Sequence, residues 1–68
     1  MKYTVVIEKT ENNYGAYVPD LPGCVAVAET QDELMELIKE AVELHIESMK
    51  LDGEQIPEPT TVSAWVEV

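Results

Sequence analysis

Basic residues are scarce in this sequence, which has no arginine and only four lysines against 14 acidic residues, for a formal net charge of −10. A surface of this sign repels phosphate backbones, and it lacks the guanidinium groups that most often read base edges. We therefore expect no direct contact with nucleic acid. An acidic surface suits a basic protein partner, although the charge is equally explained as a means of keeping a small oligomer in solution.

Cysteine and long apolar runs are also nearly absent. Cys24 is the only cysteine, so no disulfide can form within the chain. The apolar runs fall far short of the roughly 20 residues that a membrane helix needs. The first residues, Met1–Ile7, show a strand pattern and not the layout of a signal peptide. We expect a cytoplasmic protein with no membrane partner.

The 68 residues are enough for one domain, residues 1–68, with a small core. A chain of this length buries only about 60% of the surface that it exposes when unfolded. A hydrophobic fraction of 46% is high for such a core, so we expect part of the apolar surface to meet another chain. Self-association into a dimer or a multiple of dimers is the simplest outcome.

Strand patterns and one helix pattern divide the chain. Residues 2–9, 14–19 and 24–29 are rich in β-branched and aromatic residues or alternate in polarity, and short links separate them. Thr30 and Glu33 form a capping box that starts a helix, which should run to about Leu51 and stop at Gly53. Residues 61–68 alternate again and predict a last strand.

The predicted fold is α+β with the order βββαβ. The third strand runs parallel to the first, so a right-handed helical crossover returns the chain for a fourth strand beside the first. This gives a four-stranded mixed sheet of order 3-2-1-4, with one helix on one face.

The helix pattern carries a wider apolar arc than packing on a sheet requires. At 100° per residue the apolar positions cover more than half of the circumference, whereas a stripe of about 100° suffices. The outer sheet face would also carry apolar side chains with no second helix to cover them. Four residues are therefore predicted at an oligomer interface: Val6, Met35, Ile46 and Trp65.

No residue pattern indicates catalysis. Carboxylates near predicted strand ends are explained as solvated charges, and Asp32 is explained by the helix start. His45 has no second histidine or cysteine at ligand spacing and no partner nucleophile. Cys24 lies in an acidic chain that would not activate a thiol. We expect no metal, no cofactor and no enzymatic activity.

The run from Tyr14 to Cys24, Tyr-Gly-Ala-Tyr-Val-Pro-Asp-Leu-Pro-Gly-Cys, resembles the N-terminal domain of HicB-type antitoxins. So do Thr30, Glu33, the stretch 40–44 and the closing stretch 53–59. The resemblance covers nearly the whole chain and implies a truncated ribonuclease-H-like fold without the catalytic carboxylates of that enzyme. Full-length members carry a C-terminal DNA-binding domain, which residues 1–68 do not include, so we expect no operator binding from these residues.

The resemblance implies toxin neutralisation in a type II toxin-antitoxin system. Members of the family bind HicA, a small basic ribonuclease, and block its active site. Near the Pro-Gly connection and the acids beside it we predict the toxin contact at four residues: Tyr17, Asp20, Leu21 and Glu29. The alternative is an orphan homo-oligomeric or small-ligand-binding module that has no toxin partner.

Overall fold

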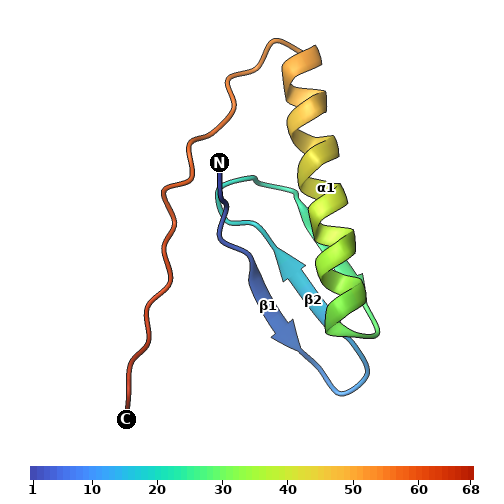
Figure 1. Ribbon diagram of the computed structural model, residues 1–68, viewed down its shortest axis with the longest axis vertical. Coiled ribbons are helices and arrows are strands. Elements are labelled where there is room, and N and C mark those ends of the chain that lie inside the picture. The colour runs from blue at the N-terminus through green and yellow to red at the C-terminus, as the bar shows by residue number, and fades with distance from the viewer.

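A computed structural model describes all residues from Met1 to Val68 (Figure 1). Three short strands precede one long helix, and the residues after the helix form an extended segment. The elements are β1 (Val6–Lys9), β2 (Tyr14–Tyr17), β3 (Val25–Ala28) and α1 (Gln31–Leu51). α1 does not combine the length and the hydropathy that a membrane-spanning helix needs.

The sheet is an antiparallel meander in the order β1-β2-β3. Val6 pairs with Tyr17 and Lys9 with Tyr14 across the first hairpin, whose turn is closed by a 2.9 Å hydrogen bond from the Thr10 N–H to the Asn13 carbonyl. In the second hairpin Tyr17 pairs with Val25. The register fixes which side chains share a face, because directly opposed residues in an antiparallel pair point the same way.

Alternation along the strands separates a helix-facing side from an outer side. Ala16 and Ala28 are buried beneath α1, whereas Tyr17, Val25 and Val27 are exposed on the other side. We call the latter side the outer sheet face. The core is small and consists of seven buried residues: Ala16, Val18, Leu21, Cys24, Ala28, Leu34 and Ile38.

Helix α1 begins and ends at the residues that the sequence indicates. The Thr30 hydroxyl accepts a 3.2 Å hydrogen bond from the Glu33 N–H, which satisfies one of the free donors of the first turn. At the other end Gly53 has a φ of 71°, and the Glu54 N–H donates to the Met49 carbonyl at 2.9 Å. This 6→1 bond belongs to a Schellman cap, in which glycine takes the left-handed conformation without strain.

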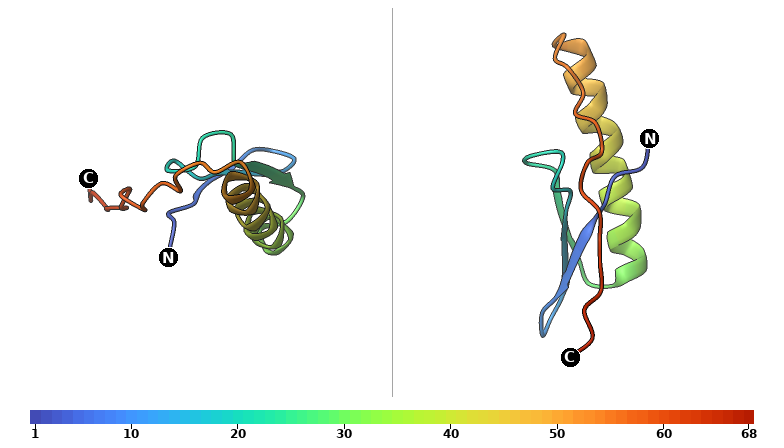
Figure 2. Two further views of the ribbon diagram at one scale, coloured as in Figure 1. Left: turned by 90° about the horizontal axis from the view of Figure 1, so that it is seen from above. Right: turned by 90° about the vertical axis from the view of Figure 1, so that its left-hand side faces the viewer.

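The helix lies over β2 and β3, and its backbone does not come close to that of β1. Figure 2 shows the same offset from above, with the helix on the β3 side of the sheet. Leu34 and Ile38 reach the core, while Met35, Leu37 and Leu44 remain exposed. The helix-facing side of β1 is thus left without a cover.

The predicted fourth strand and the 3-2-1-4 mixed sheet are wrong. The fold is βββα with a purely antiparallel three-stranded sheet. Residues 62–68 pair with no strand, and their side chains are exposed, Trp65 to 97%. The alternation of apolar and polar residues at 61–68 indicates a preference for extended backbone. A strand forms only where its N–H and C=O groups find hydrogen-bond partners. Here the segment leaves the body beside β1 without joining it (Figures 1 and 2).

Candidate partner-binding surfaces

The connection between β2 and β3 consists of two successive β-turns. The Leu21 N–H donates to the Val18 carbonyl at 3.0 Å, and the Cys24 N–H donates to the Leu21 carbonyl at 3.0 Å. Proline occupies the second position of each turn, where its fixed φ is favourable. Gly23 follows Pro22 with a φ of 85°, as the third position of a type II turn requires.

The two turns send neighbouring side chains in opposite directions. Leu21 stands at the junction and is fully buried, at 0% exposure, among the core residues. The expectation that Leu21 is an exposed contact residue is therefore corrected: its side chain belongs to the core. The preceding residue, Asp20, faces the C-terminal segment instead.

Asp20 holds the C-terminal segment through four hydrogen bonds. Its Oδ2 accepts from the backbone N–H of Thr60 at 3.1 Å and of Thr61 at 3.0 Å. Its Oδ1 accepts from the hydroxyls of the same two threonines, at 3.1 and 2.9 Å. The backbone hydrogen bond from Thr61 is the largest cause that lowers the pKa of Asp20, because donors stabilise the charged carboxylate.

Two further hydrogen bonds attach this segment to the chain before β1. The Tyr3 hydroxyl donates to the Pro57 carbonyl at 2.6 Å, and the Thr4 hydroxyl donates to the Thr61 carbonyl at 2.7 Å. Residues 57–61 are thus fixed along the β1 side of the molecule. We call the unattached residues after them, 62–68, the C-terminal arm.

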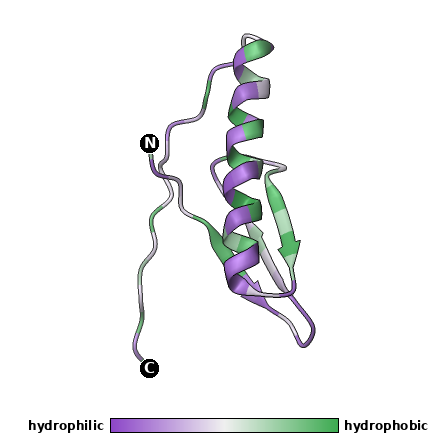
Figure 3. Ribbon diagram, turned by 45° about the vertical axis from the view of Figure 1, so that its right-hand side comes forward, coloured by the Kyte–Doolittle hydropathy of each residue, from purple (hydrophilic) through white to green (hydrophobic).

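The outer sheet face presents an apolar surface with carboxylates near it. Tyr17 is 42% exposed, and Val25 and Val27 are each 63% exposed. Figure 3 shows the hydrophobic character of β3 on this sheet. Glu8 and Glu29 are exposed, the first on β1 and the second directly after β3. An apolar centre with an acidic surround has the composition of a partner contact.

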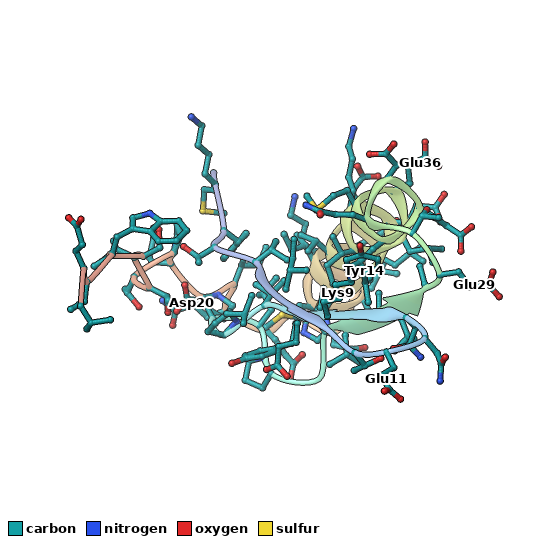
Figure 4. The ribbon with its side chains drawn as sticks, turned by 90° about the horizontal axis from the view of Figure 1, so that it is seen from below. Lys9, Glu11, Tyr14, Asp20, Glu29 and Glu36 are labelled. Atoms are coloured by element: carbon teal, nitrogen blue, oxygen red, sulfur yellow. The ribbon has the colours of Figure 1, made fainter.

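The residues predicted to contact a toxin are not brought together. Tyr17 is at the end of β2 nearest the double turn, and Glu29 follows the opposite end of β3. Figure 4 shows Asp20 and Glu29 on opposite sides of the molecule. Contact through Tyr17 and Glu29 stays a prediction, as does contact through Asp20, whose carboxylate already accepts the four threonine donors.

A groove of about 890 Å³ runs between α1 and the residues that lead into β1. We call it the β1 groove, because it lies beside the residues that precede β1, although no residue of β1 itself lines it. Met35 and Ile46, both predicted at an oligomer interface, line this groove. Val6 instead pairs with Tyr17 and shares its outer side, and Trp65 lies in the C-terminal arm. The other hydrophobic lining residues are Met1, Tyr3, Val5, Ile38 and Val42, and five charged residues of α1 complete the lining.

The family model for the HicB_like antitoxin of bacterial toxin-antitoxin systems matches residues 3–68. This chain belongs to the HicB-like antitoxin family. The resemblance carried by the Pro-Asp-Leu-Pro-Gly-Cys run is thereby confirmed.

Relatives of this HicB-like chain occur in archaea and in a phage. A UPF0150 protein of Archaeoglobus fulgidus is 52% identical over 59 residues, which cover 82% of this chain and 86% of the relative. An uncharacterized 14.9 kDa protein of the rep-hol intergenic region of Haemophilus phage HP1 is 38% identical over 66 residues. These cover 97% of this chain but 50% of the phage protein, so the HicB-like chain spans half of that relative.

The fold also matches a solved structure of the family. A chain in the structure of the HicA3 and HicB3 toxin-antitoxin complex superimposes with a TM-score of 0.74 at 30% sequence identity. The match covers 88% of this chain and 70% of the other chain. The βββα arrangement described above is therefore shared with a protein of a toxin-antitoxin complex.

The remaining titratable groups show neither a metal cluster nor an activated thiol. No group of three or more His, Cys, Asp or Glu residues is placed to hold a metal ion. Cys24 is buried, and burial raises the pKa of its thiol, which disfavours the reactive thiolate. No local pattern indicates the contact between Asp20 and the two threonines, because the partners lie 40 and 41 positions apart.

Proposed function

We propose that this HicB-like chain neutralises a small basic ribonuclease of the HicA type by direct protein–protein contact. The observation that carries the proposal is the match to a chain of a HicA–HicB complex over most of the present chain. Its net charge of −10 supports the same partner, because opposite charges speed the encounter and disfavour acidic or neutral competitors. The chain acts by binding and not by catalysis, and it does so in the cytoplasm.

The outer sheet face is the surface best suited to this contact. It combines exposed apolar side chains at Tyr17, Val25 and Val27 with the nearby carboxylates of Glu8 and Glu29. Tyrosine is among the residues that most often dominate binding energies at interfaces, since its ring is large and its hydroxyl can pair with polar groups. The carboxylates can pair with lysine or arginine side chains on a basic partner.

Binding and inhibition assays with a HicA-type ribonuclease from the same genome test the proposal. Wild-type chain should suppress RNA cleavage at stoichiometric amounts. Tyr17→Asp should weaken binding at least tenfold, or ~1.4 kcal/mol, as expected for loss of a central aromatic contact. The matched control is Leu44→Asp, which places the same charge on the exposed side of α1. Equal binding by both variants would exclude the outer sheet face, and absence of inhibition by wild-type chain would overturn the proposed function.

The alternative function is an orphan module that assembles with itself or holds a small apolar ligand. The β1 groove favours it, because the groove is lined mainly by hydrophobic side chains. Co-purification from the native host separates the two functions: a small basic protein bound to the chain supports the antitoxin, and its absence supports the orphan.

We also propose that the chain self-associates, as a dimer or a multiple of dimers. Only seven residues are buried in the core, whereas many large apolar side chains remain exposed on α1, on the outer sheet face and on the C-terminal arm. Contact with a second copy would remove part of this apolar surface from water. Light scattering over a range of concentrations tests this directly.

A further inference from the structure

We propose that the C-terminal arm of one copy adds as a strand to the free edge of β1 in a second copy, with its valines over the β1 groove, and that the exchange is reciprocal. The inference deepens the self-association proposed above and names its surface. It is independent of the identity of any toxin.

The arm has the properties of a strand without a partner. Val62, Val66 and Val68 alternate with polar residues and with Trp65, and each of these four side chains is at least 85% exposed. The arm makes no hydrogen bond with its own sheet. Extended segments rich in valine that leave their N–H and C=O groups unpaired readily complete the edge of another sheet.

In the second copy, β1 is an edge strand with one side free to pair. The edge of β1 is unpaired, and the helix-facing side of that strand is not covered by α1. The seven residues of the arm span roughly 23 Å when extended, enough to run the whole length of a four-residue strand. Valines on one face of the arm would cover Met35 and Ile46 in the groove, while Trp65 on the opposite face would lie beside Val6 on the outer side.

Geometry favours a second copy as the occupant. The arm leaves its own body at Thr61, which the hydroxyl of Thr4 and the carboxylate of Asp20 hold on the β1 side. The groove opens on that same side. In the proposed dimer a two-fold axis lies on that side, so that each arm meets the groove of the other copy in a closed, symmetric exchange. The arm also carries only one charged side chain, Glu67, so its valines can pack on the hydrophobic residues of the groove, whose lining also includes three glutamates and two lysines of α1.

Trp65 provides a test in the unmodified chain, because it is the only tryptophan and is 97% exposed. We expect its fluorescence emission to shift to shorter wavelength, and its quenching by acrylamide to fall, over the concentration range in which light scattering shows the mass doubling. A doubled mass with unchanged Trp65 emission overturns the arm exchange and leaves self-association standing. A monomer at every concentration overturns both.

Two variants locate the contact. Val66→Asp alters an exposed arm residue and Met35→Glu alters an exposed groove residue, so neither should unfold the single copy, which circular dichroism can verify. Each should shift the dimer to monomer by at least tenfold in dissociation constant. The matched control Val27→Asp, on the outer sheet face, should leave the dimer intact. Loss of the dimer in the control but not in Val66→Asp would overturn the proposal.

Mixing the two monomeric variants distinguishes reciprocal exchange from other contacts. The Val66→Asp chain keeps an intact groove and the Met35→Glu chain keeps an intact arm. The mixture should therefore regain a weak heterodimer with one exchanged arm, visible by light scattering. No heterodimer at concentrations where wild-type chain is fully dimeric would overturn the exchange. Wild-type chain keeps the outer sheet face unaltered, so failure of toxin neutralisation by the wild-type dimer would count against the proposed function alone.

Discussion

Asp20 and Thr61 lie 41 positions apart in the sequence and are joined by two hydrogen bonds, from the Thr61 N–H at 3.0 Å and from its hydroxyl at 2.9 Å. Thr60 donates an equivalent pair, so the carboxylate of Asp20 accepts four hydrogen bonds in all. The acidic residue of the Pro-Asp-Leu-Pro-Gly-Cys run therefore fixes the direction in which the chain continues after residue 61.

The first prediction concerns the charge of Asp20. Asp20→Asn replaces one acceptor oxygen by an amide group that donates, so it cannot satisfy all four threonine donors. We expect faster hydrogen exchange at the amides of Thr60 and Thr61, with unchanged exchange in α1. Glu58→Gln is the control, since it neutralises an exposed carboxylate nearby. Unchanged exchange at both threonines in Asp20→Asn would show that the carboxylate does not hold the segment.

The second prediction follows from the pKa of Asp20, which the threonine donors lower from its ordinary value of 3.8. A carboxyl group with a depressed folded-state pKa adds stability that is fully present above 3.8 and is lost as the pH falls through the lower value. The amide resonances of Thr60 and Thr61 should therefore shift together at a pH below 3.8. The transition should be missing in Asp20→Asn, and a midpoint at or above 3.8 would contradict the cause assigned here.

The third prediction separates a core role of Leu21 from a contact role. Leu21→Ala removes a fully buried side chain and should cost about 2–5 kcal/mol of unfolding free energy. Leu44→Ala makes the same change at an exposed position of α1 and should stay within about 0.5 kcal/mol. Urea denaturation followed by circular dichroism measures both. A stable Leu21→Ala chain would remove Leu21 from the core.

The fourth prediction concerns the second turn of the connection. Gly23 has a positive φ, so Gly23→Ala should destabilise the fold by about 1–2 kcal/mol even though the space around an added Cβ is open. Gly15 has equally open space but no positive φ, and Gly15→Ala should be neutral or stabilising by up to about 1 kcal/mol. Equal effects of the two substitutions would show that backbone conformation is not the cause.

The fifth prediction uses salt to separate the two proposed associations. Two copies that each carry a charge of −10 repel one another, so added salt should strengthen self-association. Binding of a basic ribonuclease is helped by the same charge, so added salt should slow its association and weaken it. Sedimentation at low and high salt measures the first and stopped-flow kinetics the second. The same direction for both would contradict the electrostatic argument.

The hairpin, the helix and both helix caps could be predicted from the sequence, because their signals are local. Thr30 and Glu33 are three residues apart, and Gly53 follows the last helical turn directly. The strand ends were less predictable, since pairing and not propensity sets them: each strand has four paired residues, although the predicted runs are longer.

Two features could not be predicted in the same way: the burial of the Leu21 side chain and the hydrogen bonds that Thr61 donates to Asp20. Both depend on how two consecutive turns orient neighbouring side chains and on contacts across 40 or more residues. The prediction of a fourth strand is wrong for a related reason. Alternation at residues 61–68 belongs to that segment alone, whereas a strand also needs a second segment to pair with, and the sheet contains only β1, β2 and β3.

All seven core residues lie between Ala16 and Ile38, and the strands are joined by short connections. A chain with such local contacts folds quickly, and proteins begin to fold from the N-terminal side while they are being synthesised. The body can thus fold without the arm, since residues 62–68 contribute no side chain to the core. The groove would then be present before any arm binds it, so arm exchange would be a docking step between two folded copies and not a step of folding.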